Sequence, residues 1–215
     1  MDDARLDFGV ADATAWEVGL SCGGKISVLV MAVSETDFAP ALLADAAKSL
    51  AQRLPVGLCL PVNGGLAQQA ASLPVTSELV DDEFWFMQAP RPQIIIIGAV
   101  HISQHLASMA MQSGFDVTVL DPRRTFATAE RFSGIKLVFD WPDRVLDEMA
   151  LDQETALVAL THDSKIDDAA LHLVLGKPLF HIACLGSRRT HAARLERLAA
   201  AGFDADATAK IKGPA

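Results

Sequence analysis

The stretch "QIIIIGAVHISQH", Gln93–His105, decides the fold. Its first half is a continuous apolar run of strand length, rich in β-branched residues, which is typical of a strand buried on both faces. Its second half continues with Ile102, Leu106 and Met109 at helical spacing, and Gly114 ends the periodic pattern. The stretch therefore predicts a buried strand, a tight turn and a helix.

The same alternation continues to the end of the chain. Strands alternating with helices predict a parallel sheet with right-handed crossovers, the Rossmann-like α/β arrangement. The further strand candidates are "DVTVLD", "KLVFDW", "TALVALTH" and "LFHIACLG", and the further helix candidates are "PDRVLDEMAL", "DDAALHLVLG" and "SRRTHAARLERLAAAGF".

The first part of the chain has a different pattern. The strand candidates "KISVLVMAV" and "GLCLPV" flank one helix candidate, "PALLADAAKSLAQRL". The proline-marked segment "QAPRP", residues 88–92, predicts a boundary. We expect a smaller α+β domain over residues 1–90 and a Rossmann-like domain over residues 91–215.

Composition excludes several classes of protein. The net charge of -9 argues against a nucleic-acid partner. The longest apolar runs are too short for a membrane span, and the start "MDDARLDFGV" does not resemble a signal peptide. Three separated cysteines without a CxxC motif indicate neither a disulfide framework nor a structural zinc site. We therefore expect a cytoplasmic protein that binds neither nucleic acid nor membrane.

The turn after the first buried strand is open to two interpretations. A dinucleotide fingerprint reads G-x-G-x-x-G, but Val100 and Ser103 stand where the second and third glycines belong, and a β-branched valine obstructs a pyrophosphate. Asp121 follows the next strand, where a ribose-binding acid belongs. The alternatives are a bound NAD(P) and a tight turn at Gly98 that serves packing alone.

Two histidines follow this turn on one face of the expected helix. His101 and His105 share that face with Ser108 and Gln112. We expect a solvated polar stripe, because a zinc site would need a third ligand that the sequence does not indicate.

The segment "CLGSRRTHAARLERL", Cys184–Leu198, pairs a helix start with two cations. Ser187 or Thr190 is suited to cap the helix. Arg188 and Arg189 are unfavourable beside the positive end of a helix unless an anion compensates them. The alternatives are a phosphate site and two surface arginines paired with acidic side chains.

The turn "THDSKIDD", Thr161–Asp168, follows another strand. Ligands of parallel α/β sheets bind beyond the carboxyl ends of the strands. Residues that we expect on one rim there are Gly98, Asp121, Thr161 and Gly186. Asp167 or Asp168 has an alternative role as a helix cap.

The three cysteines differ in their neighbours. Gly23 and Gly24 permit a sharp exposed turn after Cys22, whose thiolate is a soft ligand. Cys59 and Cys184 lie within apolar strand candidates, where cysteine is a small buried side chain. Burial remains the alternative for Cys22 as well.

Together these motifs resemble the XdhC/CoxI family, the accessory proteins of xanthine dehydrogenase and related molybdenum hydroxylases. The resemblance runs over most of the chain, from "GLSCGGKISVLV" through "IIIIGAVHIS", "VTVLDPRRTFATAERF" and "VALTHDSKIDDAAL" to "LGSRRTHAARLERLAAAGF" and "IKGP". It implies a non-catalytic maturation chaperone that binds and protects molybdenum cofactor and delivers it to the apoenzyme.

The resemblance also implies a set of cofactor-binding residues. Cys22 matches the family's cysteine before two glycines and is the expected molybdenum ligand. The remaining positions are Gly23, Gly24, Gly98, His101, Asp121, Arg123, Thr161, His162, Asp163, Gly186, Ser187, Arg188, Arg189, Thr190 and His191.

The sequence departs from the family in three places. It lacks a second cysteine motif of the form S-G-G-C and the usual continuation after "GP", and Val100 replaces a glycine. We therefore expect a partial XdhC/CoxI-type domain over residues 1–90.

Three functions and several partners follow as hypotheses. The first is the maturation chaperone, with xanthine dehydrogenase or a related molybdoenzyme as client and a cysteine desulfurase as a second partner. The others are an NAD(P)-dependent oxidoreductase, in which His162 handles a proton, and a scaffold that contacts the dehydrogenase without ligand. A homodimer is expected because the front domain should leave an apolar edge to cover.

Overall fold

The computed structural model describes residues 4–10 and 24–214. The chain divides into two compact units, residues 1–90 and residues 91–215, and the division lies between Pro90 and Arg91. Each unit is described by itself.

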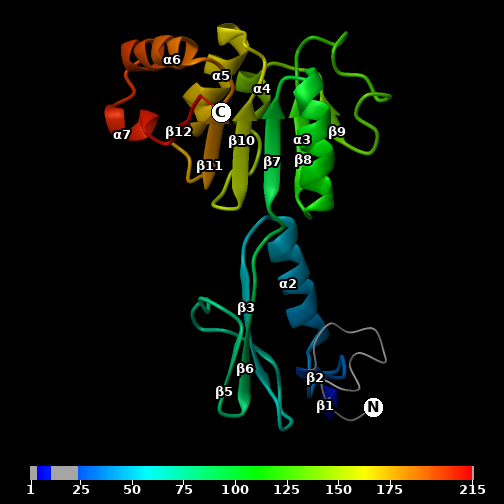
Figure 1. Cartoon of the computed structure of the whole chain (residues 1–215). Helices are drawn as coiled ribbons and strands as arrows, with labels where there is room; N and C mark the ends of the chain where they lie inside the picture. Colours follow the sequence, from blue (N-terminus) through cyan, green and yellow to red (C-terminus); the bar gives the residue numbers. More distant parts are fainter. Residues whose placement is uncertain (1–3, 11–23, 215) are drawn as a thin grey trace. The chain divides into compact units, whose positions relative to one another are not determined.

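The second unit is a six-stranded parallel sheet with helices on both faces (Figure 1). The strand order is β12-β11-β10-β7-β8-β9, so the chain starts in the middle of the sheet and crosses over once to build the other half. This is the Rossmann arrangement that the sequence predicted. Its elements are β7 Gln93–Ile97, α3 His101–Gln112, β8 Asp116–Leu120, β9 Lys136–Val138, α4 Pro142–Val145, β10 Thr155–Ala159, α5 Ser164–Val174, β11 His181–Cys184, α6 Arg188–Ala200, α7 Ala205–Thr208 and β12 Ile211–Lys212.

The central strand β7 supplies both layers of the core. All five of its residues are buried. Because side chains alternate along a strand, Ile94 and Ile96 pack on one face, in the cluster that includes Ala107 of α3. Ile95 and Ile97 pack on the other face, in the cluster that holds the buried side of α5. The unbroken isoleucine run is the reason that this strand lies between two helical layers.

The packing face of α3 consists of small side chains. Ile102 and Met109 are 46% and 59% exposed, whereas Ser103, Ala107 and Ala110 are buried against the sheet. Small side chains on this face let the helix backbone approach the branched side chains of the strands closely. Of the three apolar residues at helical spacing, Leu106 packs against the core, whereas Ile102 and Met109 lie on the exposed side of the helix.

The helix predicted over "PDRVLDEMAL" is shorter than expected. It ends at Val145, and Leu146 follows it into the core. Residues 146–148 form a turn, and Met149 and Leu151 pack against the same core cluster. Within the described ranges no helix is long and apolar enough to cross a membrane.

The first unit contains two antiparallel sheets and a helix. A four-stranded sheet has the order β4-β3-β6-β5, and β1 pairs with β2 in a separate ribbon. The sequence predicted β2, β3 and α2, but not β1, β4, β5 or β6. The elements are β1 Ala4–Val10, β2 Gly24–Val30, α2 Pro40–Ala51, β3 Val56–Pro61, β4 Gln68–Gln69, β5 Glu78–Val80 and β6 Glu83–Gln88.

The ribbon of β1 and β2 exposes an apolar face. Leu6 lies opposite Val28 and Phe8 opposite Ile26, so these four side chains share one side of the ribbon. Phe8 and Ile26 are 55% and 61% exposed. A two-stranded ribbon with an open apolar face is marginally stable in water by itself.

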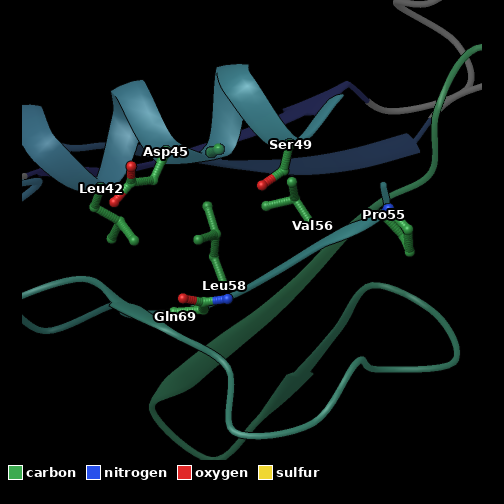
Figure 2. A pocket seen from close by; sticks show the side chains of 8 residues that line it. Leu42, Asp45, Ser49, Pro55, Val56, Leu58 and Gln69 are labelled. Carbon is green, nitrogen blue, oxygen red and sulfur yellow. The ribbon is translucent and has the colours of Figure 1, made fainter. Parts of the chain in front are cut away.

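A pocket of the first unit lies between α2 and the four-stranded sheet (Figure 2). Leu42, Asp45 and Ser49 of α2 line one side, and Val56 and Leu58 of β3 face them. The lining is mostly aliphatic, with Asp45 as its acidic side chain. The predicted site residues of the second unit are not part of this lining.

Candidate functional site

The predicted site residues of the second unit lie at the carboxyl edge of the parallel sheet. Gly98 directly follows β7 and Asp121 directly follows β8, while Thr161 and Gly186 come two residues after β10 and β11. The strand order reverses between β7 and β10, which is the position where open α/β sheets bind ligands. A Cβ atom on Gly98 would lie 2.6 Å from the Thr161 side chain, so the turns after β7 and β10 touch at this point.

The turn from β7 to α3 is fixed by short hydrogen bonds. Gly98 has a φ of +106° and its backbone N–H donates to the carbonyl of Leu120 over 2.8 Å. Ser103 Oγ donates to the Gly98 carbonyl over 2.5 Å. The N–H of Ala99 donates to Asp121 Oδ2 over 2.8 Å. The turn is thus tied to the end of β8 on both sides of Gly98.

Asp121 is fully buried and already paired. Besides Ala99 N, its carboxylate accepts hydrogen bonds of 2.8 to 2.9 Å from the backbone N–H, Nε and Nη2 of Arg123. Burial alone would raise the pKa of Asp121, but the Arg123 side chain and the backbone N–H groups outweigh it and lower the pKa. The carboxylate therefore holds the rim together, and its oxygens are not open to the ribose or pterin that the sequence assigned to them.

The start of α6 carries two exposed arginines. Ser187 is the N-cap and its Oγ accepts a 3.1 Å hydrogen bond from Thr190 N, which confirms the predicted cap. Arg188 and Arg189 are exposed, and within residues 4–10 and 24–214 neither forms an ion pair. Their backbone N–H groups belong to the first helical turn, which has no acceptors of its own. This end of the helix is therefore suited to an anion.

The turn from β10 to α5 contains an unusual backbone conformation. His162 has a φ of +60°, a left-handed value that is uncommon for residues other than glycine, and its side chain is exposed. Thr161 Oγ1 accepts from Asp163 N over 3.0 Å, and Asp163 caps α5 by accepting from Lys165 N. Asp163 is therefore the cap, and the alternative that assigned this role to Asp167 or Asp168 is wrong.

His191 is covered by the end of the chain. It lies one turn into α6, is half-buried, and a Cβ atom on Gly213 would lie 2.7 Å from its Nδ1. Burial, followed by the nearby charge of Arg194, lowers the pKa of His191. His191 is therefore covered by the "IKGP" segment. The other matched residues of this helix start, from Ser187 to Thr190, face solvent.

The histidines of α3 are solvated, as predicted. His101 and His105 are exposed, and their ring centroids are 5.0 Å apart. No group of three or more His, Cys, Asp or Glu side chains suited to a metal ion occurs among the described residues. His101 reaches the rim because it is the first residue of α3.

The cysteines fall into different environments. Cys22 and Gly23 lie outside the described residues, and Gly24 is the first residue of β2. Cys184 is fully buried, and burial raises the pKa of its thiol to about 12. Cys59 is half-buried, and burial, followed by the charge of Glu83, raises its pKa as well. The prediction of a buried Cys184 is confirmed, and Cys59 is buried only in part.

These environments predict the order of thiol modification. Because the thiolate is the reactive form, iodoacetamide at pH 8 should leave Cys184 unmodified in the native protein and modify Cys59 slowly. If Cys22 is the presented thiol, it should be alkylated first. Mass spectrometry of tryptic peptides measures this order, with the urea-unfolded protein as the control in which all three react. Equal labelling of Cys184 in the native and unfolded protein would contradict its burial.

The sequence interpretation missed one functional feature of the rim. Arg194 and Asp167 are both 2% exposed and lie 3.7 Å apart between α6 and α5. The available signal was weak: Arg194 precedes the buried Leu198 by one helical turn and so shares its face. Charged residues are rarely fully buried, so a helical position alone does not single out this arginine.

Comparison with known proteins gives the following relatives. The chain is 27% identical over 215 residues to the molybdenum cofactor insertion chaperone PaoD of Escherichia coli strain K12, covering 99% of this chain and 58% of that protein. Over 99 residues it is 31% identical to a Bacillus subtilis strain 168 protein described as a probable subunit of xanthine dehydrogenase, covering 46% of this chain and 30% of that protein. The chain thus spans little more than half of the first relative and less than a third of the second.

A solved structure shares the fold. The crystal structure of a Bacillus halodurans protein described as a xanthine dehydrogenase has a TM-score of 0.67 and 21% identity, covering 99% of this chain and 68% of that chain. The family model of the XdhC Rossmann domain matches residues 94–215, which is more than half of the sequence and nearly the whole second unit. The chain therefore belongs to the XdhC family, in agreement with the resemblance seen in its motifs.

Proposed function

We propose that this protein binds molybdenum cofactor, protects it and delivers it to xanthine dehydrogenase or a related molybdenum hydroxylase. The observation that carries the proposal is the exposed Arg188–Arg189 pair at the capped start of α6, at the carboxyl edge of the sheet, for which the described residues contain no ion-pair partner. Family membership and the name of the Escherichia coli relative support the same assignment. Here the cofactor is cargo, and the protein is a chaperone and not a catalyst.

The residues present fit the parts of this cargo. The cofactor is an anionic pterin with a terminal phosphate and a metal bound through sulfur. Arg188 and Arg189, with the first N–H groups of α6, would hold the phosphate. The turn of Thr161, His162 and Asp163 offers hydrogen-bonding groups for the pterin edge.

The remaining matched positions have other tasks in this proposal. Cys22 supplies a thiolate to molybdenum, with Gly23 and Gly24 allowing its presentation. Asp121 and Arg123 act by fixing the rim, because their polar groups bond to each other. The glycines, Gly98 and Gly186, let the backbone turn at the strand ends with φ values of +106° and +147°.

The geometry favours this function over that of an NAD(P)-dependent oxidoreductase. The acid that would bind a ribose, Asp121, accepts from Arg123 and Ala99. Val100 stands at the position where a dinucleotide needs a glycine. Because the chain offers neither a free ribose-binding acid nor this glycine, the cationic start of α6 suits an anion better than the turn after β7 does.

The proposal also covers the partners of the protein and its cellular compartment. The client is a molybdoenzyme, and we propose the cytoplasm as the compartment. A cysteine desulfurase that installs the terminal sulfur and a second copy of this chain are the further proposed partners. The exposed apolar face of the β1–β2 ribbon, including Phe8 and Ile26, supports an additional contact of the first unit, which we propose to be a partial XdhC/CoxI-type domain.

The test measures binding of molybdenum cofactor released from a purified molybdoenzyme. The double variant Arg188→Ala/Arg189→Ala should bind about 30-fold more weakly, since two charge-assisted contacts to the phosphate are lost. The Cys22→Ala variant should retain the pterin but lose the molybdenum contact, measured as a lower molybdenum-to-pterin ratio after gel filtration.

Two controls separate this effect from a general change of charge. Arg144→Ala removes a surface arginine of α4 that pairs with Asp140, and it should leave binding unchanged. Inorganic phosphate should compete with the cofactor in the wild type and lose this effect in the double variant. Unchanged affinity in the double arginine variant, together with an unchanged molybdenum-to-pterin ratio in Cys22→Ala, would refute the proposal. Tighter binding of NADH than of cofactor would favour the oxidoreductase.

A further inference from the structure

A buried ionic network lies beneath the rim. Arg194 Nη2 is 3.7 Å from Asp167 Oδ2, and Asp167 Oδ1 accepts a 2.6 Å hydrogen bond from Thr161 Oγ1. Arg194 Nη2 also donates to the carbonyl of Leu185 over 3.1 Å, and Nη1 lies 3.5 Å from His191 Nδ1. One network therefore contacts the turn after β10, the turn after β11 and the first turns of α6.

Stability alone gives a poor account of this network. The closest ionic contact is longer than a hydrogen bond, and Arg194 Nε is buried without an acceptor in the described part of the chain. Burying two charges costs desolvation, and apolar side chains of similar size often replace such pairs without loss of stability. Burial also raises the pKa of Asp167, which shows that its charge is held at a cost. What the network does provide is a fixed geometry between two turns.

The two turns that it joins carry the proposed ligand contacts. Thr161 opens the turn assigned to the pterin edge, and its hydroxyl binds both Asp163 N and Asp167. Leu185 and His191 flank the cap and the two arginines assigned to the phosphate. The turns belong to neighbouring parallel strands, β10 and β11, with their own helices. Leu185 N donates to the Ala159 carbonyl at the strand ends, and the network extends this tie to Thr161 and the start of α6.

We propose that Asp167 and Arg194 are positioning residues that lock the Thr161–Asp163 turn and the start of α6 into one rigid ligand-binding rim. This inference rests on the proposed function for its ligand but not for the lock itself. Neither side chain touches the cargo. Their effect on binding passes through Thr161, Leu185 and His191.

The test removes both charges together. The variant Asp167→Leu/Arg194→Met replaces the pair with apolar side chains of similar volume and should keep the fold, because no unpaired buried charge remains. Hydrogen exchange of the free protein then reports the lock without any ligand. The amides of Asp163, Leu185 and His191 should exchange about tenfold faster, since local opening no longer breaks contacts to a charged group. Amides of β7 should keep their protection.

A matched control exists on the same two helices. Arg197 of α6 pairs with Asp168 of α5, but this pair is partly exposed and contacts neither turn. The variant Asp168→Leu/Arg197→Met should leave exchange at the three rim amides unchanged. If the buried double variant does not fold, hydrogen exchange can be measured on Arg194→Lys instead. Lysine keeps a positive charge opposite Asp167 but lacks the planar guanidinium that reaches the Leu185 carbonyl.

The outcomes distinguish the lock from the proposed function. Faster exchange at the rim together with about tenfold weaker cofactor binding supports both. Faster exchange in a protein whose wild type does not bind cofactor keeps the lock and refutes the function. Unchanged exchange at the rim amides in a folded buried variant, or an equal increase in the control variant, overturns the positioning role.

Discussion

Replacing Gly98 with alanine is expected to destabilise the second unit by about 4 kcal/mol. The residue has a φ of +106°, which a side chain makes costly, and the new Cβ would lie 2.6 Å from Thr161 Cγ2 and 3.2 Å from its backbone nitrogen. The backbone of a buried rim turn is less able to move aside than a flexible side chain. The displaced Thr161 would also disturb its hydrogen bond to Asp167.

The matched control is Gly202→Ala. Gly202 follows α6 with a φ of +96°, but nothing lies within 4 Å of an added Cβ atom. This substitution should lower the free energy of unfolding by about 1 kcal/mol, because the positive φ is the remaining source of strain. Thermal unfolding of the full chain, with hydrogen exchange of β7 to identify the second unit, measures both variants. Equal losses in the two variants would show that the contact between Gly98 and Thr161 does not constrain the rim.

The second large effect is expected for Asp121→Asn, with a loss of about 3 kcal/mol near pH 7. Asparagine keeps one acceptor, but its amide group would face the donors of Arg123, and the guanidinium would lose its counter-charge. The loss should be accompanied by faster exchange at Ala99, whose N–H binds this carboxylate.

The pH dependence of this loss has a definite sign. The folded-state pKa of Asp121 is lowered, so its contribution is fully present above the unfolded value of about 3.9 and disappears as the pH falls through the folded value. The difference between wild type and Asp121→Asn should therefore be constant from pH 7 to about pH 5 and shrink below about pH 4. Urea unfolding over this range measures it.

The control for this variant lies at the opposite end of β8. Asp116→Asn removes an exposed carboxylate whose contact with Arg91 is a surface pair, and it should change stability by less than about 0.5 kcal/mol. A difference between wild type and Asp121→Asn that grows as the pH falls would contradict the assigned cause.

The sequence was sufficient for most of the second unit because its signals are local, although α7 and the sixth strand, β12, were not predicted. An isoleucine run identifies β7, and a glycine and a capping serine mark the turn before α6. The packing face of α3 was not predictable in this way. Its buried residues are serine and alanine, which are selected by close approach to the sheet and not by hydrophobicity. The strands of the first unit depend on antiparallel partners far apart in the sequence, so that "EFWFMQ" becomes β6 only beside β3.

The site also contains features that follow from neighbouring residues and features that depend on the folded chain. The exposed arginines and the Ser187 cap follow from neighbouring residues, and both are where the sequence placed them. The partner of Asp121 did not follow, because it depends on Arg123 folding back over two residues. The buried network did not follow either, since Asp167 and Arg194 meet only after β10 and β11 have paired.

The direction of β12 determines how closely the backbone approaches the start of α6. Because β12 runs parallel to β11, the polypeptide leaves the sheet at the same end as the Ser187 cap, and Gly213 lies against the His191 ring. Any side chain at position 213 would collide with the imidazole, so glycine is the residue that lets the backbone pass over this face of the helix start.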